Sequence, residues 1–230
     1  MKKAAIIQSN YIPWLGYFDI IHDVDIFVFL EDVQYTKNDW RNRNKIKTPK
    51  GTEWITVPVL GGIHQKIFET KIDNSKLWTK KHKQAIHANY AATENYTCYK
   101  DDIFEIYDRK FDTISELNIY AIKKICNLLD IETEFVNSKD LDVSGRKDDR
   151  VIEICREIGA DYYLSGPAAK DYIENDKFLD ACIKLEYKSY EGYPEYKQLW
   201  GEFTRYVSVI DLIFNCGEKS PYYIWGWRKK

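Results

Sequence analysis

The fold is decided by two short apolar runs, Ala4-Ala5-Ile6-Ile7 and Ile26-Phe27-Val28-Phe29-Leu30, with a helical pattern over residues 16–24 between them. Apolar runs without polar alternation are typical of strands that are buried on both faces, as in parallel sheets. A strand, a short helix and a second strand in this order predict an α/β fold.

The later sequence repeats this rhythm after a helical middle. Residues 43–48 and 54–59 flank the turn-rich Pro49-Lys50-Gly51-Thr52, which predicts a β-hairpin. The spacing of apolar residues predicts helices over 76–89 and 101–130, then a strand over 133–136, a helix over 148–158, a strand over 161–164, a helix over 167–172, a strand over 183–187 and a helix over 208–214. We expect a Rossmann-like, mostly parallel sheet with an inserted hairpin. It would form a single domain over 1–230, with an α/β core over about 1–60 and 131–217 and a helical insertion over about 76–130.

Composition narrows the class of protein. The formal net charge is −2, which gives no overall field to draw the chain onto DNA or anionic lipid, so broad nucleic-acid binding is disfavoured. The five cysteines show no C-x-x-C spacing and lie mostly in apolar patterns, which predicts reduced thiols in the core. No signal peptide and no apolar run of membrane-spanning length is visible, so we expect a cytoplasmic protein without membrane insertion.

The segment after the first strand is the first candidate binding site. Gln8, Ser9 and Asn10 follow that strand directly, and ligands of open α/β folds bind beyond the carboxyl ends of the strands. Gly16 would allow a close backbone approach, and the helix that it opens would offer free amides to an anion. Alternatively, Pro13 and Trp14 form only an aromatic cap over the core.

The segment Glu31-Asp32-Val33-Gln34-Tyr35 follows the second strand and brings carboxylates and an amide to the same sheet edge. Either acid could bind sugar hydroxyls, act as a base or hold a metal. Asp32 is the better candidate, since it is further from the buried run and Gln34 and Tyr35 can flank it. A solvated loop is the alternative.

The segment Trp40-Arg41-Asn42-Arg43-Asn44-Lys45 is the third candidate. If it is a strand, Arg41, Arg43 and Lys45 share one face, while Trp40, Asn42 and Asn44 share the other. Guanidinium groups bind phosphate oxygens in pairs, so this row of cations predicts a clamp for pyrophosphate. A solvated hairpin surface is the plainer reading.

Two weaker signals complete the candidates. Ser165-Gly166-Pro167 lies at a strand-to-helix junction, which suits either an anion site or a tight turn. The four histidines do not form a convincing metal set, so no metal is predicted, and His64 is the one to test for acid-base chemistry.

Taken together, the motifs resemble the WbqC-like protein family. They are Gln8-x-x-Tyr11-x-Pro13-Trp14-x-Gly16-Tyr17-Phe18, Asp32-x-Gln34-Tyr35, Trp40-Arg41-Asn42-Arg43-x-x-Ile46-Lys47, Ser165-Gly166 and Ser208-x-x-Asp211-x-x-Phe214-Asn215-x-Gly217. The resemblance covers nearly the whole chain. It implies a role in bacterial O-antigen and other surface-polysaccharide synthesis, and some members are described as transferases that attach an amino acid such as glycine to an amino sugar.

The sequence and the resemblance together suggest an enzyme that forms an amide on the amino group of a nucleotide-linked deoxyamino sugar, with an acyl or amino-acid donor. ATP or an activated acyl donor would be the co-substrate. In this hypothesis Arg41, Arg43 and Lys45 hold pyrophosphate, the rings of Tyr11, Trp14 and Tyr35 surround the sugar or base, and Asp32 or His64 removes the proton. The alternative is a non-catalytic nucleotide-sugar binding or scaffold protein of the same pathway.

Overall fold

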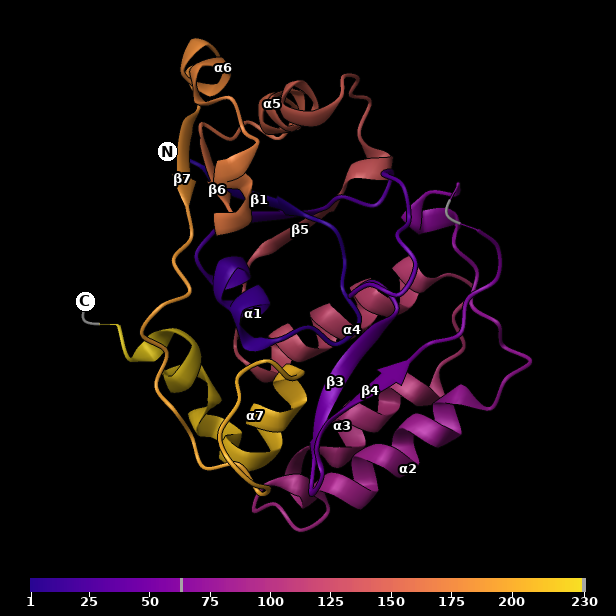
Figure 1. The fold of residues 1–230 in the computed structure, drawn as a ribbon. Coiled ribbons are helices and arrows are strands. Elements are labelled where there is room, and N and C mark those ends of the chain that lie inside the picture. The colour runs from indigo at the N-terminus through magenta and orange to yellow at the C-terminus, as the bar shows by residue number, and fades with distance from the viewer. Residues whose placement is uncertain (63, 229–230) are drawn as a thin grey trace.

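The computed structural model describes residues 1–62 and 64–228, and its centre is a five-stranded sheet (Figure 1). The strand order is β5-β2-β1-β6-β7, and each pair of neighbours is parallel. The strands are β1 (Lys3–Ile7), β2 (Ile26–Phe29), β5 (Glu134–Asn137), β6 (Tyr162–Ser165) and β7 (Lys184–Tyr187). The predicted α/β fold with a mostly parallel sheet is therefore confirmed.

The central strands are apolar because both faces of the sheet are covered. On β1, the side chain of Ala5 belongs to the larger core, whereas Ala4 and Ile6 belong to a smaller core on the other face. The smaller core is closed by α5 (Lys147–Glu157) and α6 (Asn175–Asp180), which lie together at the top of Figure 1. A strand buried on both faces cannot alternate apolar and polar residues, which explains the continuous runs in the sequence.

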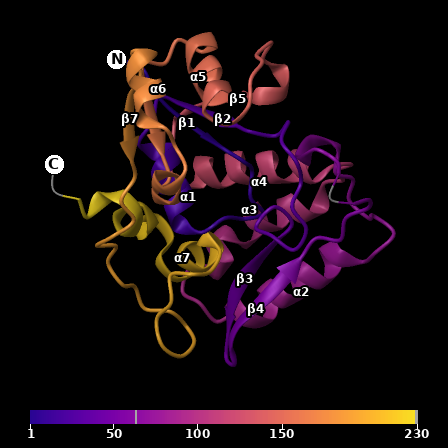
Figure 2. The same ribbon diagram turned by 45° about the horizontal axis from the view of Figure 1, so that its top comes forward.

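The predicted hairpin is present as β3 (Arg43–Thr48) and β4 (Gly51–Thr56), paired antiparallel. It lies apart from the main sheet and beside α2 (Figure 2). The second strand begins and ends earlier than predicted, because only Pro49 and Lys50 lie between the strands. Gly51 continues the ladder with φ of 114°, a conformation that favours glycine.

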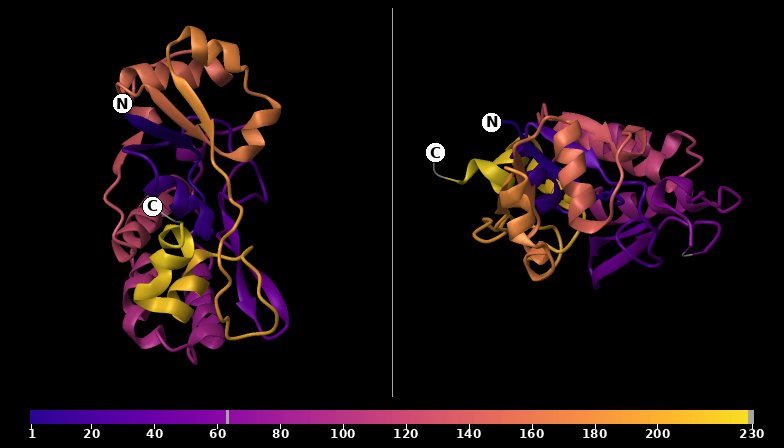
Figure 3. Two further views of the ribbon diagram at one scale, coloured as in Figure 1. Left: turned by 90° about the vertical axis from the view of Figure 1, so that its left-hand side faces the viewer. Right: turned by 90° about the horizontal axis from the view of Figure 1, so that it is seen from above.

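The helical middle consists of three helices rather than the two that were predicted. They are α2 (Trp78–Tyr90), α3 (Tyr96–Asp108) and α4 (Ile114–Leu128). The continuous helix expected over 101–130 is interrupted at residues 109–113, since the Thr113 side chain accepts a hydrogen bond from Glu116 N and so starts a new helix. Figure 3 (left) shows α2, α3 and the hairpin at the end of the molecule opposite α5 and α6.

The remaining helices connect the sheet with the middle region. Helix α1 (Leu15–His22) connects β1 to β2 along the chain. Helix α7 (Val209–Cys216) is followed by a short π-helix, Tyr222–Gly226, that packs against α1. The predicted helix over 167–172 is a short 3-10 helix, Pro167–Asp171.

The prediction that the cysteines lie in the core holds only in part, because Cys126 and Cys155 are buried but Cys98 and Cys182 are exposed. In the described residues, we find no helix with the length and apolar character needed to cross a bilayer.

Candidate functional site

A cavity lies at the point of the sheet where the order in which strands are added changes direction. From β1 the chain adds β2 and β5 on one side, and later β6 and β7 on the other, so β1 and β6 are the neighbours at which the order reverses. Ligands of open α/β sheets bind at this point, outside the carboxyl ends of the strands. A cavity of about 600 Å³ is found there, lined by Gln8 after β1, Leu30 after β2 and Ser165 at the end of β6.

This central cavity brings together half of the predicted binding residues, from three separate segments of sequence. They are Gln8, Asn10, Trp14, Arg41, Ser165 and Gly166. Four tyrosines share the lining: Tyr17, Tyr163, Tyr172 and Tyr190. Of these, Tyr163 and Tyr172 were not singled out as binding residues from the sequence. Tyr17 lies inside the first motif, and its hydroxyl donates to the Gln8 carbonyl at 3.0 Å, so its place in that motif was a usable signal.

Arg41 is the one charged residue among the described residues that line the central cavity. Its backbone carbonyl accepts a hydrogen bond from Asn118 Nδ2 at 2.8 Å, and its Nη1 lies 3.1 Å from an Asp39 oxygen. Arg41 precedes β3, which begins at Arg43, so the direction of its side chain is not set by the alternation of side chains along that strand. A guanidinium group fixed in this way suits an anionic group of a ligand.

Three polar atoms of residues that line the central cavity are buried without a hydrogen-bond partner: Gln8 Oε1, Asn10 Oδ1 and Arg41 Nε. An unpaired buried polar atom costs about 1–3 kcal/mol, so such atoms are rare and call for an explanation. All three belong to one cavity at the place where the fold class binds ligands. The residues that line the cavity thus have hydrogen-bonding capacity that the protein itself does not use.

Trp14 separates the central cavity from a second space, which we call the aromatic recess. Its indole ring packs edge-on against Tyr190, with ring centroids 5.0 Å apart. The recess has a volume of about 190 Å³ and is lined by Asn10, Pro13, Trp14, Trp40, Asn44 and Tyr206. Because Asn10 and Trp14 line both spaces, the recess and the central cavity are neighbours.

A third space of about 360 Å³ adjoins the central cavity on its other side. It shares with that cavity the residues Ile6, Leu30, Tyr163 and Tyr172. Its own lining includes Lys147, Asp148 and Arg150 of α5. The three spaces are therefore neighbours, and they lie in a row from α5, past the ends of β1 and β6, to the hairpin.

Comparisons with known proteins identify relatives of this chain. The model of the WbqC-like protein family matches residues 8–223, which include the residues that line the recess and, apart from Ile6 and Ile7, those that line the central cavity. The chain belongs to the WbqC-like protein family. A relative in Mycobacterium tuberculosis, named uncharacterized protein Rv1507c, is 45% identical over 227 residues, covering 97% of this chain and 98% of the relative. No solved structure matched significantly.

Asp32, the predicted base, does not line the central cavity of this WbqC-like chain. Its carboxylate is paired with the guanidinium group of Arg150, and it accepts a hydrogen bond of 2.5 Å from Ser138 Oγ. The neighbouring Glu31 is buried and accepts from both the backbone and the hydroxyl of Ser9, and burial raises the pKa of this carboxyl. The structure thus gives each acid a protein partner, and neither acid lines the central cavity.

The other acid-base candidate and the remaining residues of the second motif also lie outside the central cavity. His64 is exposed in the loop before the short 3-10 helix at Ile67–Glu69. Gln34 is exposed and forms a β-bridge with Lys66. Tyr35 is buried, and burial raises the pKa of its hydroxyl to about 12.

Tyr11 is a core residue rather than a wall of the cavity. Its side chain is 0% exposed, and its hydroxyl lies 2.8 Å from His82 Nδ1 and 2.9 Å from the hydroxyl of Tyr107. The His82 Nε2 atom lies 3.2 Å from the carbonyl oxygen of Thr56. A neutral imidazole that donates through Nε2 and accepts through Nδ1 satisfies both contacts, and burial lowers the pKa of His82 to about 4.

The basic hairpin does not bring all three of its cations to the central cavity. Arg43 and Lys45 lie on the same face of β3 and over the ring of Trp54, at 4.2 and 5.0 Å from its centroid. On the opposite face, the predicted side chains of Asn42 and Asn44 point inward and are buried. The predicted alternation therefore holds from residue 42 to 45, whereas Arg41 alone reaches the cavity.

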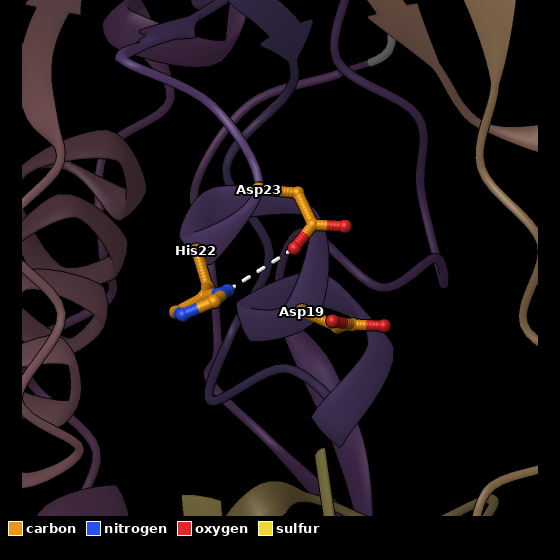
Figure 4. A group of neighbouring side chains, drawn as sticks. All are labelled: Asp19, His22 and Asp23. Carbon is orange, nitrogen blue, oxygen red and sulfur yellow. Dashed lines mark hydrogen bonds and ion pairs between the residues drawn. The ribbon is translucent and has the colours of Figure 1, made fainter. Parts of the chain in front are cut away.

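Asp19, His22 and Asp23 lie close enough together to hold a metal ion, as Figure 4 shows. The two carboxylates, however, already have cationic partners. Lys188 Nζ lies 2.8 Å from Asp19 and 2.5 Å from Asp23, and Arg228 lies 2.6 and 2.7 Å from the same two residues. We interpret this group as an ion-pair cluster that joins α1 to the chain after β7 and to the C-terminal turn.

Proposed function

We propose that this WbqC-like protein acts in bacterial surface-polysaccharide synthesis, where it binds a nucleotide-linked deoxyamino sugar in the central cavity and forms an amide on the sugar's amino group. The observation that carries the proposal is the convergence of Gln8, Asn10 and Arg41, each with an unpaired buried polar atom, at the reversal point of a parallel sheet. This combination suits a ligand with an anionic group and several hydroxyl groups.

The proposed reaction joins two substrates. The amine nitrogen attacks the carbonyl carbon of an activated acyl or aminoacyl group, such as an acyl phosphate made with ATP. A carbon–nitrogen bond forms, the bond from that carbon to the leaving group breaks, and the amine gives up a proton. A row of three neighbouring spaces offers room for a donor beside the sugar, and holding both reactants together supplies much of the rate.

One observation favours a second candidate, a nucleotide-sugar binding protein without catalysis. Among the described residues, the lining of the central cavity includes no carboxylate and no imidazole. The predicted bases Asp32 and His64 lie elsewhere, so a base would have to act from the adjoining space, where Asp148 is found, or come from the substrate.

Mass spectrometry tests the enzymatic proposal. The protein is incubated with nucleotide-linked amino sugars, ATP and glycine or other amino-acid or acyl donors, and we expect the mass of the sugar nucleotide to rise by the mass of the donor acid minus one water. The matched control is Arg41→Gln, which should bind the sugar nucleotide poorly. Absence of a mass gain with every donor, together with binding by calorimetry, would favour the binding protein, and absence of binding would contradict both.

A further inference from the structure

The aromatic recess carries an inference that rests on the proposed function and makes it more specific. Two of its walls are large side chains left open to solvent: Trp40 is 43% exposed and Tyr206 is 70% exposed. Exposed aromatic side chains that border a concavity are a common feature of ligand sites, because they lose water contact when a ring stacks on them.

The recess and the central cavity are joined through consecutive residues. Trp40 lines the recess, and the next residue, Arg41, lines the central cavity. The backbone at this point is held in place, because the Trp40 carbonyl accepts a hydrogen bond from Tyr11 N at 2.8 Å. A ligand that places a ring against Trp40 therefore has its next group close to a guanidinium.

Volume limits what each space can hold. The recess has a volume of about 190 Å³, which is about a third of the volume of the central cavity, about 600 Å³. The recess thus fits one small ring system. The central cavity fits a larger group, such as a sugar with its phosphates.

Polarity decides which ring belongs in the recess. A sugar ring carries several hydroxyl groups that need partners, and the polar side chains Gln8, Arg41 and Ser165 lie in the central cavity. In the recess, the Asn44 amide is already bonded to the carbonyls of Tyr11 and Ile12. Apart from the polar atoms of the aromatic side chains, this leaves Asn10, whose Oδ1 is unpaired, as the polar contact there. A flat aromatic ring with a polar edge matches this lining.

We propose that the aromatic recess is the base subsite of the sugar nucleotide, in which the nucleobase stacks on Trp40 and Tyr206 and meets the amide of Asn10 at its polar edge, while Arg41 binds the phosphates. The Trp40 ring is supported by Trp54, with centroids 5.2 Å apart, and Trp54 carries the cations of Arg43 and Lys45. These two cations add positive potential on the side of the recess that Trp54 supports.

Calorimetry with a base-bearing and a base-free probe tests the subsite. The probes are a panel of nucleoside diphosphates (UDP, dTDP, GDP, CDP and ADP) and inorganic pyrophosphate. Stacking of one base on an aromatic ring is worth about 1–3 kcal/mol, so Trp40→Ala and Tyr206→Ala should each weaken binding of the preferred nucleoside diphosphate by about 5- to 150-fold. Pyrophosphate binding should stay the same, and Trp40→Phe should restore most of the lost affinity.

The matched control is Tyr222→Ala, which removes another exposed aromatic ring, 53% exposed, from a surface outside the recess. It should leave both probes unaffected. The subsite is overturned if Trp40→Ala and Tyr206→Ala bind the nucleoside diphosphate as well as the original protein does, if they lose pyrophosphate binding equally, or if no nucleoside diphosphate binds. The mass-spectrometric assay decides the reaction separately, because a product can form while the base subsite is wrong.

Discussion

The indole ring of Trp14 lies directly over Gly16, and a Cβ atom at position 16 would come within 2.3 Å of its Cζ2 atom. The close approach that was predicted for Gly16 is therefore made by the neighbouring ring rather than by a ligand. Trp14 lines both the central cavity and the aromatic recess. The absence of a side chain at position 16 therefore allows the Trp14 ring to lie where it forms the wall between them.

The first prediction concerns this contact. Gly16→Ala should destabilise the protein by about 1–3 kcal/mol, because the overlap with the Trp14 ring outweighs the better helix propensity of alanine. It should also weaken binding of a sugar nucleotide by moving Trp14. Thermal unfolding and calorimetry measure the two effects. Gly62→Ala is the control, since a Cβ atom there meets nothing within 4 Å. Equal stability of the two variants would show that the ring moves freely.

The second prediction separates Arg41 from Arg43, which lie two residues apart. Arg41→Gln should weaken binding of a nucleoside diphosphate by about 2–4 kcal/mol, because it removes the one charged side chain among the described residues that line the central cavity. Arg43→Gln should cost less than about 1 kcal/mol, since Arg43 lies over Trp54 and acts only at a distance. Similar losses in both variants would support the clamp of three cations expected from the sequence.

The third prediction concerns the pair formed by Asp32 and Arg150. Their side chains are 15% and 16% exposed, so the pair is partly buried. Asp32→Asn and Arg150→Met should each lower the free energy of unfolding by about 1–3 kcal/mol, and the double variant should lose less than the sum. Urea unfolding measures all three. A loss of product in Asp32→Asn that Arg150→Met does not share would instead identify Asp32 as the catalytic base.

The fourth prediction follows from the lowered pKa of His82. In the folded protein burial lowers this pKa to about 4, whereas an unfolded chain has a histidine pKa of about 6.5. As the pH falls below about 6.5, the unfolded chain binds a proton that the folded protein does not, so stability is lost between about pH 6.5 and pH 4. Between about pH 7 and pH 5 we expect a loss of about 2 kcal/mol.

The loss of stability predicted for His82 at low pH is tested with His82→Gln, which keeps an amide near the hydroxyl of Tyr11 but does not titrate. This variant should be less stable at neutral pH and should lack that part of the pH dependence. Chemical unfolding at the two pH values gives the difference. If the free energy of unfolding of the variant falls with pH as steeply as that of the original protein, groups other than His82 cause the pH dependence.

The sequence predicted the sheet well because local rules govern its strands. The apolar runs of β1 and β2 are buried on both faces, and a parallel sheet requires this pattern. The break between α3 and α4 was missed, since the apolar spacing continues past it and only the capping residues Thr113 and Glu116 mark the new start. These two residues could have been recognised in the sequence as a capping box.

The site was harder to predict, because it depends on which side chains the tertiary structure turns outward. Gln8, Arg41 and Ser165 are distant in sequence and line one cavity. The rule for strand ends was the basis for proposing Gln8, whereas Ser165 was proposed from a strand-to-helix junction and Arg41 from the basic hairpin. Tyr11 and Asp32 fit the same rule but have partners inside the protein, in His82 and Arg150. Both partners come from helices whose position relative to the sheet no local pattern specifies.

The ion-pair cluster at α1 has a consequence for how the chain matures during synthesis. Lys188 follows Asp23 by 165 residues along the chain, and Arg228 follows it by 205. Until Lys188 has left the ribosome, α1 therefore carries two neighbouring carboxylates without these counter-ions. We expect nascent chains that stop before Lys188 to hold α1 loosely, because the packing of this early helix depends on residues that are made much later.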